Sequence, residues 1–593
     1  MSISKEQLSD YKDKYEEAEN LVEVDSKHDP PTEPYRSHYK AMNILVEMQQ
    51  NLKNLLNDLP EDESDDTRRL LLYILGFLYK DTGRICVWTQ ELANGEKDLM
   101  KCLELLEPYK MNQECVNAYL GALNQIGILW SNRNDATTSK EYLERADKLF
   151  NEFKASKKTP FTIYDIFGSK DEIEHGKGMD MLEQTHTLTL YYLAQILGVL
   201  GDLHQSAVLC HRTLQRQLEF NDYEHVDWAL NAATLSQYFF QNDRNTESRH
   251  HLAAASYIMG KYESQMLQPE MSEDERSAVL EVFNHRSADI NRCWAKYGLN
   301  LLLESRNRLM KDDEDDSDKG KLQEGMEKVS LNEQCKFESL SIGPFEDVIT
   351  DQYALMFDDA KPIFLAIQNW LNKAKEYYTL DSEASEYAKI VQDQASAYKY
   401  LAFYDFDDGN RCKLHKRQAD LLEGLLTMNP TYYMNICREV WFELGSTYST
   451  MMDIKLEAFE KLKIQENPRP HVINKINLLC QKSITKFQEF IDSYSDKDKN
   501  ELRKNIPADE MQPILFTYFQ IGRLYYKFIT PDKKSQITNV SNCLKYYTLF
   551  MKTYEDNKSL AEHFKQEYGV CREMVELLPL KIMKLRSETE GSA

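Results

Sequence analysis

The chain contains few residue combinations that could carry out chemistry. Cys412-x-x-His415 could supply half of a zinc site, but no second half follows at metal-site spacing. His250 and His251 are adjacent, and adjacent residues do not share a helix face, so we expect no shared metal. Gly176-Lys177-Gly178 lacks the Ser/Thr-ended pattern of a phosphate-binding loop, and metalloprotease and serine-hydrolase motifs are absent. These observations predict a protein that is not an enzyme and has no catalytic residue, cofactor, metal or small-molecule substrate.

The charge balance excludes further classes. Lys and Arg total 72 against 97 Asp and Glu, a net charge of −25, so we expect neither a general nucleic-acid binder nor a protein held on anionic lipid. The densest basic run, residues 411–417, lacks interleaved aromatics; it fits an exposed helix face or a contact with acidic groups. The longest uncharged stretch, residues 187–201, is too short to span a membrane. The eleven widely spaced cysteines suggest reduced, mostly buried thiols of a cytosolic protein.

The elements that would position any functional residue are predicted to be helices. Glycine (21) and proline (16) occur in 593 residues at about half their usual frequencies of ~7% and ~5%. A chain with so few breakers favours long helices and has few tight β-turns. The composition therefore predicts an all-α fold.

One spacing recurs along the chain: a large apolar residue, another three positions later, then a small residue, then a large residue three further on. This pattern is the first-helix signature of the tetratricopeptide repeat (TPR), whose large residues share one helix face while the small residue lets the partner helix approach. The seven copies are Leu72-x-x-Leu75-Gly76-x-x-Tyr79, Leu123-x-x-Ile126-Gly127-x-x-Trp130, Leu190-x-x-Leu193-Ala194-x-x-Leu197, Ala232-x-x-Leu235-Ser236-x-x-Phe239, Trp294-x-x-Tyr297-Gly298-x-x-Leu301, Trp441-x-x-Leu444-Gly445-x-x-Tyr448 and Tyr518-x-x-Ile521-Gly522-x-x-Tyr525.

The repeats predict a TPR-like right-handed α-solenoid. Second helices are expected at 139–150, 206–214 and 248–255, after turns at Gly201-Asp202 and Asn242-Asp243. Irregular spacing indicates insertions at 61–66, 154–179 and 311–325, and the signature lapses between Gly298 and Gly445. We therefore expect an N-terminal lobe (1–310), an acidic loop and linker region (311–345) and a C-terminal lobe (346–593).

A solenoid of this kind usually binds proteins on its concave face. In TPR first helices certain positions point into that groove, and here they carry amides, hydroxyls and aromatic rings with few charges. The alternative is an inner face covered by solvent or by the other lobe. A clamp for acidic chaperone peptides would need Lys, Asn and Arg there, and only Asn124 fits. The groove positions are Asn124, Gln125, Ile128, Asn132, Leu188, Tyr191, Tyr192, Gln195, Val199, Leu230, Ala233, Thr234 and Gln237.

Several stretches resemble a known family, the KIF-binding (kinesin-binding) proteins, and the resemblance runs from about residue 30 to 585. It departs most in the acidic insertions and in 311–345. The stretches that carry it are 123–131, 190–195, 228–237, 411–417, 451–454 and 573–579.

The resemblance implies a partner that the periodicity does not. Family members bind the motor domains of a subset of kinesins and keep them off microtubules, using two TPR-type lobes joined by a linker helix. The motor would lie on the concave side of the N-terminal lobe, at positions corresponding to Tyr192, Gln195, Thr234 and Gln237.

Gln125 and Ile128, also on the groove, complete the predicted partner-binding set. The expected role is regulation of microtubule-based intracellular transport and cytoskeletal organisation, with consequences for neuronal development, by a cytoplasmic, cytoskeleton-associated protein. The alternative is a general TPR scaffold, a cargo adaptor or co-chaperone for other protein partners.

Overall fold

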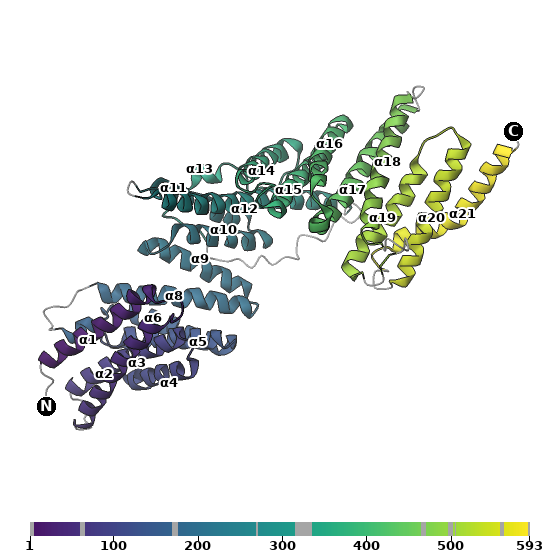
Figure 1. Ribbon diagram of the computed structural model, residues 1–593. Helices are drawn as coiled ribbons and strands as arrows, with labels where there is room; N and C mark the ends of the chain where they lie inside the picture. The colour runs from purple at the N-terminus through teal and green to yellow at the C-terminus, as the bar shows by residue number, and fades with distance from the viewer. Residues whose placement is uncertain are drawn as a thin grey trace. The chain divides into compact units, whose positions relative to one another are not determined.

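The computed structural model describes residues 5–59, 66–168, 176–268, 271–314, 335–463, 470–495, 502–503, 506–557 and 562–590. In these ranges the regular structure is helical, apart from one isolated bridge between Ser495 and Leu502. The chain packs into two compact units, Met1–Trp228 and Ala229–Ala593 (Figure 1). The all-α prediction is confirmed.

The described residues of the first unit form nine α-helices and the first turn of a tenth. Each first helix of a predicted pair packs against the next helix, giving the pairs α3/α4, α5/α6 and α8/α9, with α2 packed on α3 and α1 packed on α2. The described helices are α1 (Lys5–Glu23), α2 (Arg36–Asn57), α3 (Asp66–Trp88), α4 (Leu92–Leu106), α5 (Val116–Asn132), α6 (Ala136–Ala155), α7 (Ile163–Phe167), α8 (Lys177–Val199), α9 (Leu203–Phe220) and α10 (His225–Gln241).

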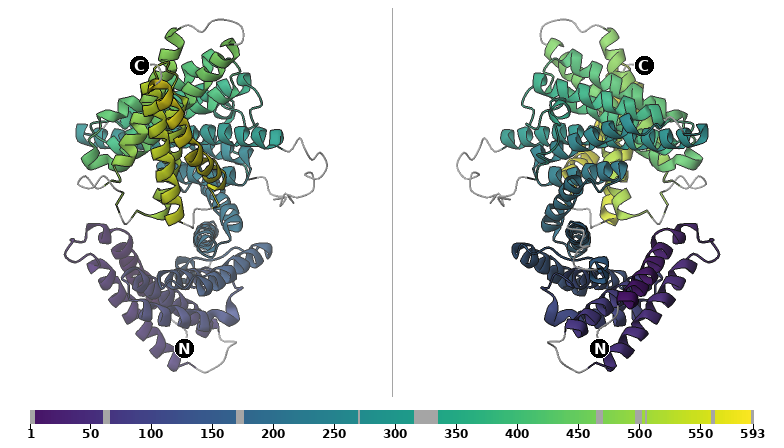
Figure 2. Two further views of the ribbon diagram at one scale, coloured as in Figure 1. Left: turned by 90° about the vertical axis from the view of Figure 1, so that its right-hand side faces the viewer. Right: turned by 90° about the vertical axis from the view of Figure 1, so that its left-hand side faces the viewer.

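The second unit begins within α10 and continues as a row of packed helices from α11 to α21 (Figures 1 and 2). Consecutive members pack on one another, except that α12 pairs with α14 across the short α13. The helices are α11 (Asn245–Gln265), α12 (Glu273–Glu314), α13 (Gly343–Glu346), α14 (Phe357–Tyr377), α15 (Ala384–Tyr404), α16 (Asp408–Gly424), α17 (Pro430–Lys463), α18 (Pro470–Asp492), α19 (Ala508–Lys527), α20 (Lys533–Asp556) and α21 (Lys565–Glu590).

The small residue of the repeat signature is the point of closest approach between paired helices. A Cβ atom built on Gly76, Gly127, Gly298, Gly445 or Gly522 would stand only 2.6 or 2.7 Å from a side chain of the partner helix. Real Cβ atoms do not approach so closely, so a larger residue would force the pair apart. The reason given for the signature, close approach of the second helix, is confirmed at these five positions.

A hydroxyl on the second helix repeatedly bonds to the same point of the first. Ser139, Ser206 and Ser483 donate to the carbonyl oxygens of Gly127, Ala194 and Gly445, at 2.7, 2.8 and 2.6 Å. This bond fixes the register of each pair where the helices are closest.

The predicted second helices and turns are also confirmed. The expected segments 139–150, 206–214 and 248–255 lie in α6, α9 and α11. Gly201 and Asp243 adopt positive φ angles of 86° and 58° in their turns, and the Asp202 carboxylate caps α9 by accepting from the Gln205 amide at 3.1 Å.

The expected lobe boundary at 311–345 is not where the packing divides the chain. Residues 315–334 lie outside the described ranges, as do 61–65 and 169–175 of the other expected insertions. On either side of 315–334, α12 and α14 pack as a pair, with Gly298 against Ile367. The lobes 1–310 and 346–593 and their linker therefore stay a prediction, whereas the division between the compact units falls after Trp228 in the sequence.

Candidate partner-binding strips on α8 and α10

Helix α8 presents one uncharged strip. Gln184, Leu188, Tyr191, Gln195 and Val199 are exposed, and their spacing of three or four residues places them along one side of the helix. We call these five residues the α8 strip. The amides can donate and accept hydrogen bonds, while Leu188, Tyr191 and Val199 offer apolar surface.

Tyr192 stands at the edge of the α8 strip and is half-buried. Its ring packs against the hydrophobic core of the first unit and meets the Tyr191 ring edge-on, with centroids 5.3 Å apart. Burial raises the pKa of its phenol, so the hydroxyl stays protonated and can donate. A rigid, partly exposed tyrosine of this kind is a common anchor in protein interfaces.

A hollow opens beside the α8 strip, between α8 and α9. Its volume is about 290 Å³, and its wall mixes amides, hydroxyls and one carboxylate with the apolar side chains of α8. The lining residues are Gln184, Thr187, Leu188, Tyr191, Thr213, Gln217 and Asp222. The α8 strip therefore borders a depression that a partner side chain of moderate size would fit.

Charged residues beneath α8 hold it against α6 and α9. The Glu183 carboxylate pairs with Lys154 at 2.8 Å and with Arg216, and the Arg216 guanidinium also donates to Thr187 at 3.0 Å. These bonds come from three different helices, so they fix both the position and the rotation of α8.

A buried histidine makes a second set of contacts between α8 and α6. His186 stacks on Phe150, with ring centroids 3.6 Å apart, and its Nε2 lies 2.7 Å from Asp147 of α6. Burial lowers the pKa of His186, although the Asp147 carboxylate opposes that shift. The α8 strip thus rests on a well-anchored helix.

Two residues of the predicted partner-binding set do not lie on an exposed face. Gln125 and Ile128 of α5 are 9% and 8% exposed, and Ile128 belongs to the core of the first unit. The reason is that α8 packs across α5, with the Asn124 side-chain amide donating to the Thr185 carbonyl at 2.8 Å. The expectation that these α5 positions are open to a partner is therefore not met.

Helix α10 presents a second uncharged strip. Asn231, Thr234, Gln237 and Gln241 are exposed at spacings of three and four residues. We call these four residues the α10 strip. Ala233, predicted for the same groove, is buried.

The two central side chains of the α10 strip have partners within the second unit. The Thr234 hydroxyl donates to the Leu230 carbonyl at 2.8 Å, which leaves its oxygen able to accept from a ligand. Gln237 contacts the thiol of Cys293 on α12; burial raises the pKa of that thiol, and the contact with Gln237 opposes the rise. The structure thus brings Tyr192 together with Gln195 on α8, and Thr234 together with Gln237 on α10.

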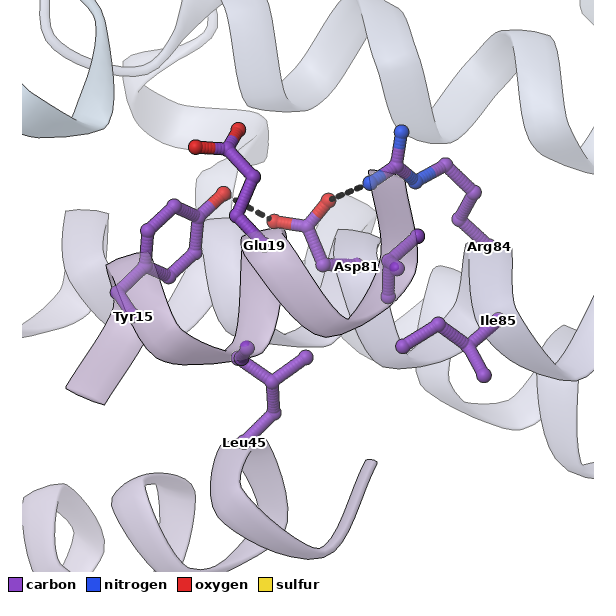
Figure 3. Close-up of a pocket in the computed structure, with 8 residues that line it drawn as sticks. Tyr15, Glu19, Leu45, Asp81, Arg84 and Ile85 are labelled. Atoms are coloured by element: carbon purple, nitrogen blue, oxygen red, sulfur yellow. Dashed lines mark hydrogen bonds and ion pairs between the residues drawn. The ribbon is translucent and has the colours of Figure 1, made fainter. Parts of the chain in front are cut away.

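Another cluster of polar residues, in the first unit, is structural. Asp81 of α3 accepts from the Tyr15 hydroxyl at 2.8 Å and pairs with Arg84 at 3.6 Å (Figure 3). It also pairs with Lys80 at 2.7 Å. The neighbouring cavity has a volume of about 10 Å³, room for one water molecule. The cluster fastens α1 to α3 and cannot hold a ligand.

The residues considered for metal binding have other partners. The Cys412 thiol contacts the Met451 carbonyl, and His415 bonds to Gln418 at 3.0 Å. His250 bonds through Nδ1 to Glu346 and accepts the Phe337 amide at Nε2. Throughout the described ranges, no group of three or more His, Cys, Asp or Glu side chains is placed to hold a metal ion.

Neither a membrane-spanning helix nor a disulfide is found in the described structure. No helix there is long and apolar enough to cross a bilayer. All eleven cysteines are free thiols, and nine of them are buried.

Comparisons with known proteins find matches along nearly the whole chain. Residues 226–585 match the family model described as KIF-1 binding protein C terminal. A KIF-binding protein of Drosophila melanogaster is 42% identical over 595 residues, covering 99% of this chain and 98% of the relative. Its counterpart in Homo sapiens is 31% identical over 620 residues, covering 97% and 98%.

A solved structure is similar in fold over nearly the whole chain. The structure of a protein named kinesin binding protein (KBP) has a TM-score of 0.64 and 27% identity, covering 98% of this chain and all of that one. Similarity in sequence and fold thus extends over nearly the full length. The chain belongs to the KIF-binding protein family.

Proposed function

We propose that this protein binds the motor domains of a subset of kinesins and prevents their attachment to microtubules, without catalysis of its own. The observation that carries the proposal is its membership, over nearly the full length, of a family named for binding kinesins. In this role the protein acts in the cytoplasm, beside the cytoskeleton, and regulates microtubule-based transport.

The proposed contact surface consists of Tyr192, Gln195, Thr234 and Gln237. All four are fully or partly exposed, and all come from helices at corresponding positions of neighbouring repeats. Amide and hydroxyl groups impose directional requirements on a partner, whereas Tyr192 and the apolar part of the α8 strip supply buried area on binding. The combination suits selective recognition of one protein surface.

Net charge explains how such a surface could compete with a microtubule. A motor surface that docks on acidic tubulin must be complementary to negative charge, and this chain carries a net charge of −25. Long-range attraction would therefore bring the same motor surface to this protein, and it would speed association more than it strengthens the final complex. Raising the salt concentration should slow association in stopped-flow measurements and leave dissociation little changed.

Microtubule co-sedimentation tests the proposed activity. Purified kinesin motor domains are pelleted with microtubules in the presence and absence of this protein. Loss of the motor from the pellet, with a soluble complex in the supernatant, is the expected result. Co-pelleting of the protein with the motor and the microtubule would instead indicate a cargo adaptor and would refute the inhibitory role.

Alanine substitutions test the contact surface. Replacing Tyr192, Gln195, Thr234 and Gln237 together should weaken motor binding at least about 100-fold, because interface anchors each contribute about 1–2 kcal/mol or more. The two pairs should also be tested separately, since they lie in different compact units.

A matched control is available on α18. Gln481 and Thr485 are exposed, and the Thr485 hydroxyl donates to the carbonyl four residues earlier, as that of Thr234 does. Their double alanine variant should bind the motor like the unmodified chain. Equal affinity of the fourfold variant and this control would refute the surface assignment while leaving kinesin binding itself open to the pelleting test.

A further inference from the structure

Helix α21 has one covered and one open side. Cys571, Leu578 and Ile582 are buried against α20, and the Tyr568 ring stacks on Tyr554 with centroids 4.4 Å apart. Lys581 reaches over the ring of Tyr526 on α19. Figure 1 shows α21 as the outermost helix of the row formed by α17–α21. No described helix of the second unit covers the opposite side.

That open side is apolar at its centre. Leu577, Leu580 and Met583 are 57%, 62% and 65% exposed, and Val570 is 46% exposed. Apolar side chains repeated along one exposed helix face mark an interaction surface more often than isolated ones do. We call the residues in line on this side the α21 outer face: Val570, Glu573, Leu577, Leu580, Lys584 and Ser587.

The charges of the α21 outer face are arranged symmetrically about its leucines. Glu573 lies four residues before Leu577, and Lys584 lies four residues after Leu580. Both are exposed, and neither forms an ion pair with another residue of the described chain. The midpoint of the two leucines and the midpoint of the two charges coincide, at the bond between Leu578 and Pro579.

A two-fold axis that runs between two antiparallel copies of α21, level with that bond, makes the face complementary to itself. In a contact between identical surfaces, residue i of one copy meets residue j of the other, and j meets i. Here Leu577 would meet Leu580 of the second copy, and Glu573 would meet Lys584 of the second copy, about 8 Å on either side of the axis at 1.5 Å per residue. A parallel arrangement would instead oppose Glu573 to Glu573 and Lys584 to Lys584.

We propose that the α21 outer face is a homodimer interface in which two copies of this chain pair their α21 helices antiparallel. The occupant is a second copy of this chain, because the face pairs opposite charges and apolar side chains against itself in reverse. An interface of one helix per copy is small, so the dimer should be weak and concentration-dependent.

Sedimentation velocity of the full chain, over concentrations from submicromolar to several hundred micromolar, tests the proposal. The expected result is a reversible shift from monomer to dimer. Leu577→Glu, which places two carboxylates at the axis, should keep the chain monomeric throughout. Leu478→Glu on α18 is the control, since Leu478 is also 57% exposed, and it should dimerise normally.

Charge exchange tests the register. Glu573→Lys alone, or Lys584→Glu alone, opposes like charges at two places and should weaken the dimer by roughly tenfold. The double variant Glu573→Lys/Lys584→Glu restores opposite charges in the same positions and should dimerise like the unmodified chain. Failure of the double variant to recover would overturn the antiparallel pairing.

A carbodiimide crosslink gives an independent readout. Glu573 and Lys584 of one chain are about 16 Å apart along α21, too far for a zero-length crosslink, so any such product must join two copies. Mass spectrometry should find this crosslink at high protein concentration. A chain that is monomeric at every concentration, or a dimer that Leu577→Glu leaves intact, would refute the proposal.

Discussion

The start of α8 depends on a glycine that touches another segment of backbone. A Cβ on Gly178 would lie 1.9 Å from the carbonyl oxygen of Pro160, whereas ordinary contact begins at 3.4 Å. Gly178→Ala therefore forces the helix or the Pro160 segment to move by about 1.5 Å. The Asn117 side chain resists this movement, because it donates to the carbonyl oxygens of both Gly178, at 3.1 Å, and Phe161, at 3.0 Å.

The expected cost follows from these contacts. Overpacking that shifts backbone costs about 1–3 kcal/mol, and loss of an Asn117 hydrogen bond adds about 1 kcal/mol. Alanine recovers at most about 1 kcal/mol of helix propensity, so the free energy of unfolding should fall by about 2 kcal/mol. Because α8 carries Tyr192 and Gln195, the proposed kinesin affinity should fall as well.

Urea unfolding and motor binding should be measured on the same variants. Gly198→Ala is the control on the same helix, because its nearest neighbour, the Ser206 hydroxyl oxygen, would be 3.4 Å from the new Cβ. That variant should be neutral or slightly stabilising. An unchanged urea midpoint for Gly178→Ala would refute the view that this backbone contact seats α8.

Three further predictions concern stability, each measured by urea unfolding. Asp81→Asn should cost about 3–5 kcal/mol, because the buried Lys80 and the partly buried Arg84 lose their counter-charge; Asp58→Asn, at an exposed site, should change little. Ser483→Ala should cost about 1 kcal/mol through the lost bond to the Gly445 carbonyl, and a neutral result would contradict a stabilising role for that bond. Burial lowers the pKa of His250 below its usual 6.5, so stability should be complete above pH 6.5 and decline as the pH falls through the lowered pKa; the same acid sensitivity in His250→Gln would exclude His250 as its source.

The repeat signature was readable from sequence because its requirement is steric. A small residue between large apolar ones is needed wherever two helices approach closely, and Gly127 and Gly445 meet that requirement with no alternative side chain. The signature is absent from α15, and the reason is again the packing of its side chains. There Gln394 occupies the position of the second large apolar residue, and it is buried because its amide donates to Asn372 at 2.8 Å. Only the structure shows that this glutamine is buried and hydrogen-bonded.

The candidate site was only partly readable. Helical position correctly indicated exposed side chains at Gln195, Thr234 and Gln237, because these lie opposite the buried face of their own helices. The same positions on α5 gave Gln125 and Ile128, which α8 covers. Groove position within one repeat does not reveal the angle of the next helix, since that angle depends on packing between α5, α6 and α8.

The two strips and the net charge point to separate steps of the proposed binding. The α8 and α10 strips carry no charged residue, so electrostatic attraction cannot distinguish one partner from another at the contact itself. Discrimination must then come from the geometry of amides, hydroxyls and the Tyr192 ring, which a mismatched surface would leave desolvated and unpaired. The 25 excess negative charges lie elsewhere on the chain and act at a distance, where they favour encounter with any basic surface. A binder built in this way meets many motors quickly and retains those whose polar groups match.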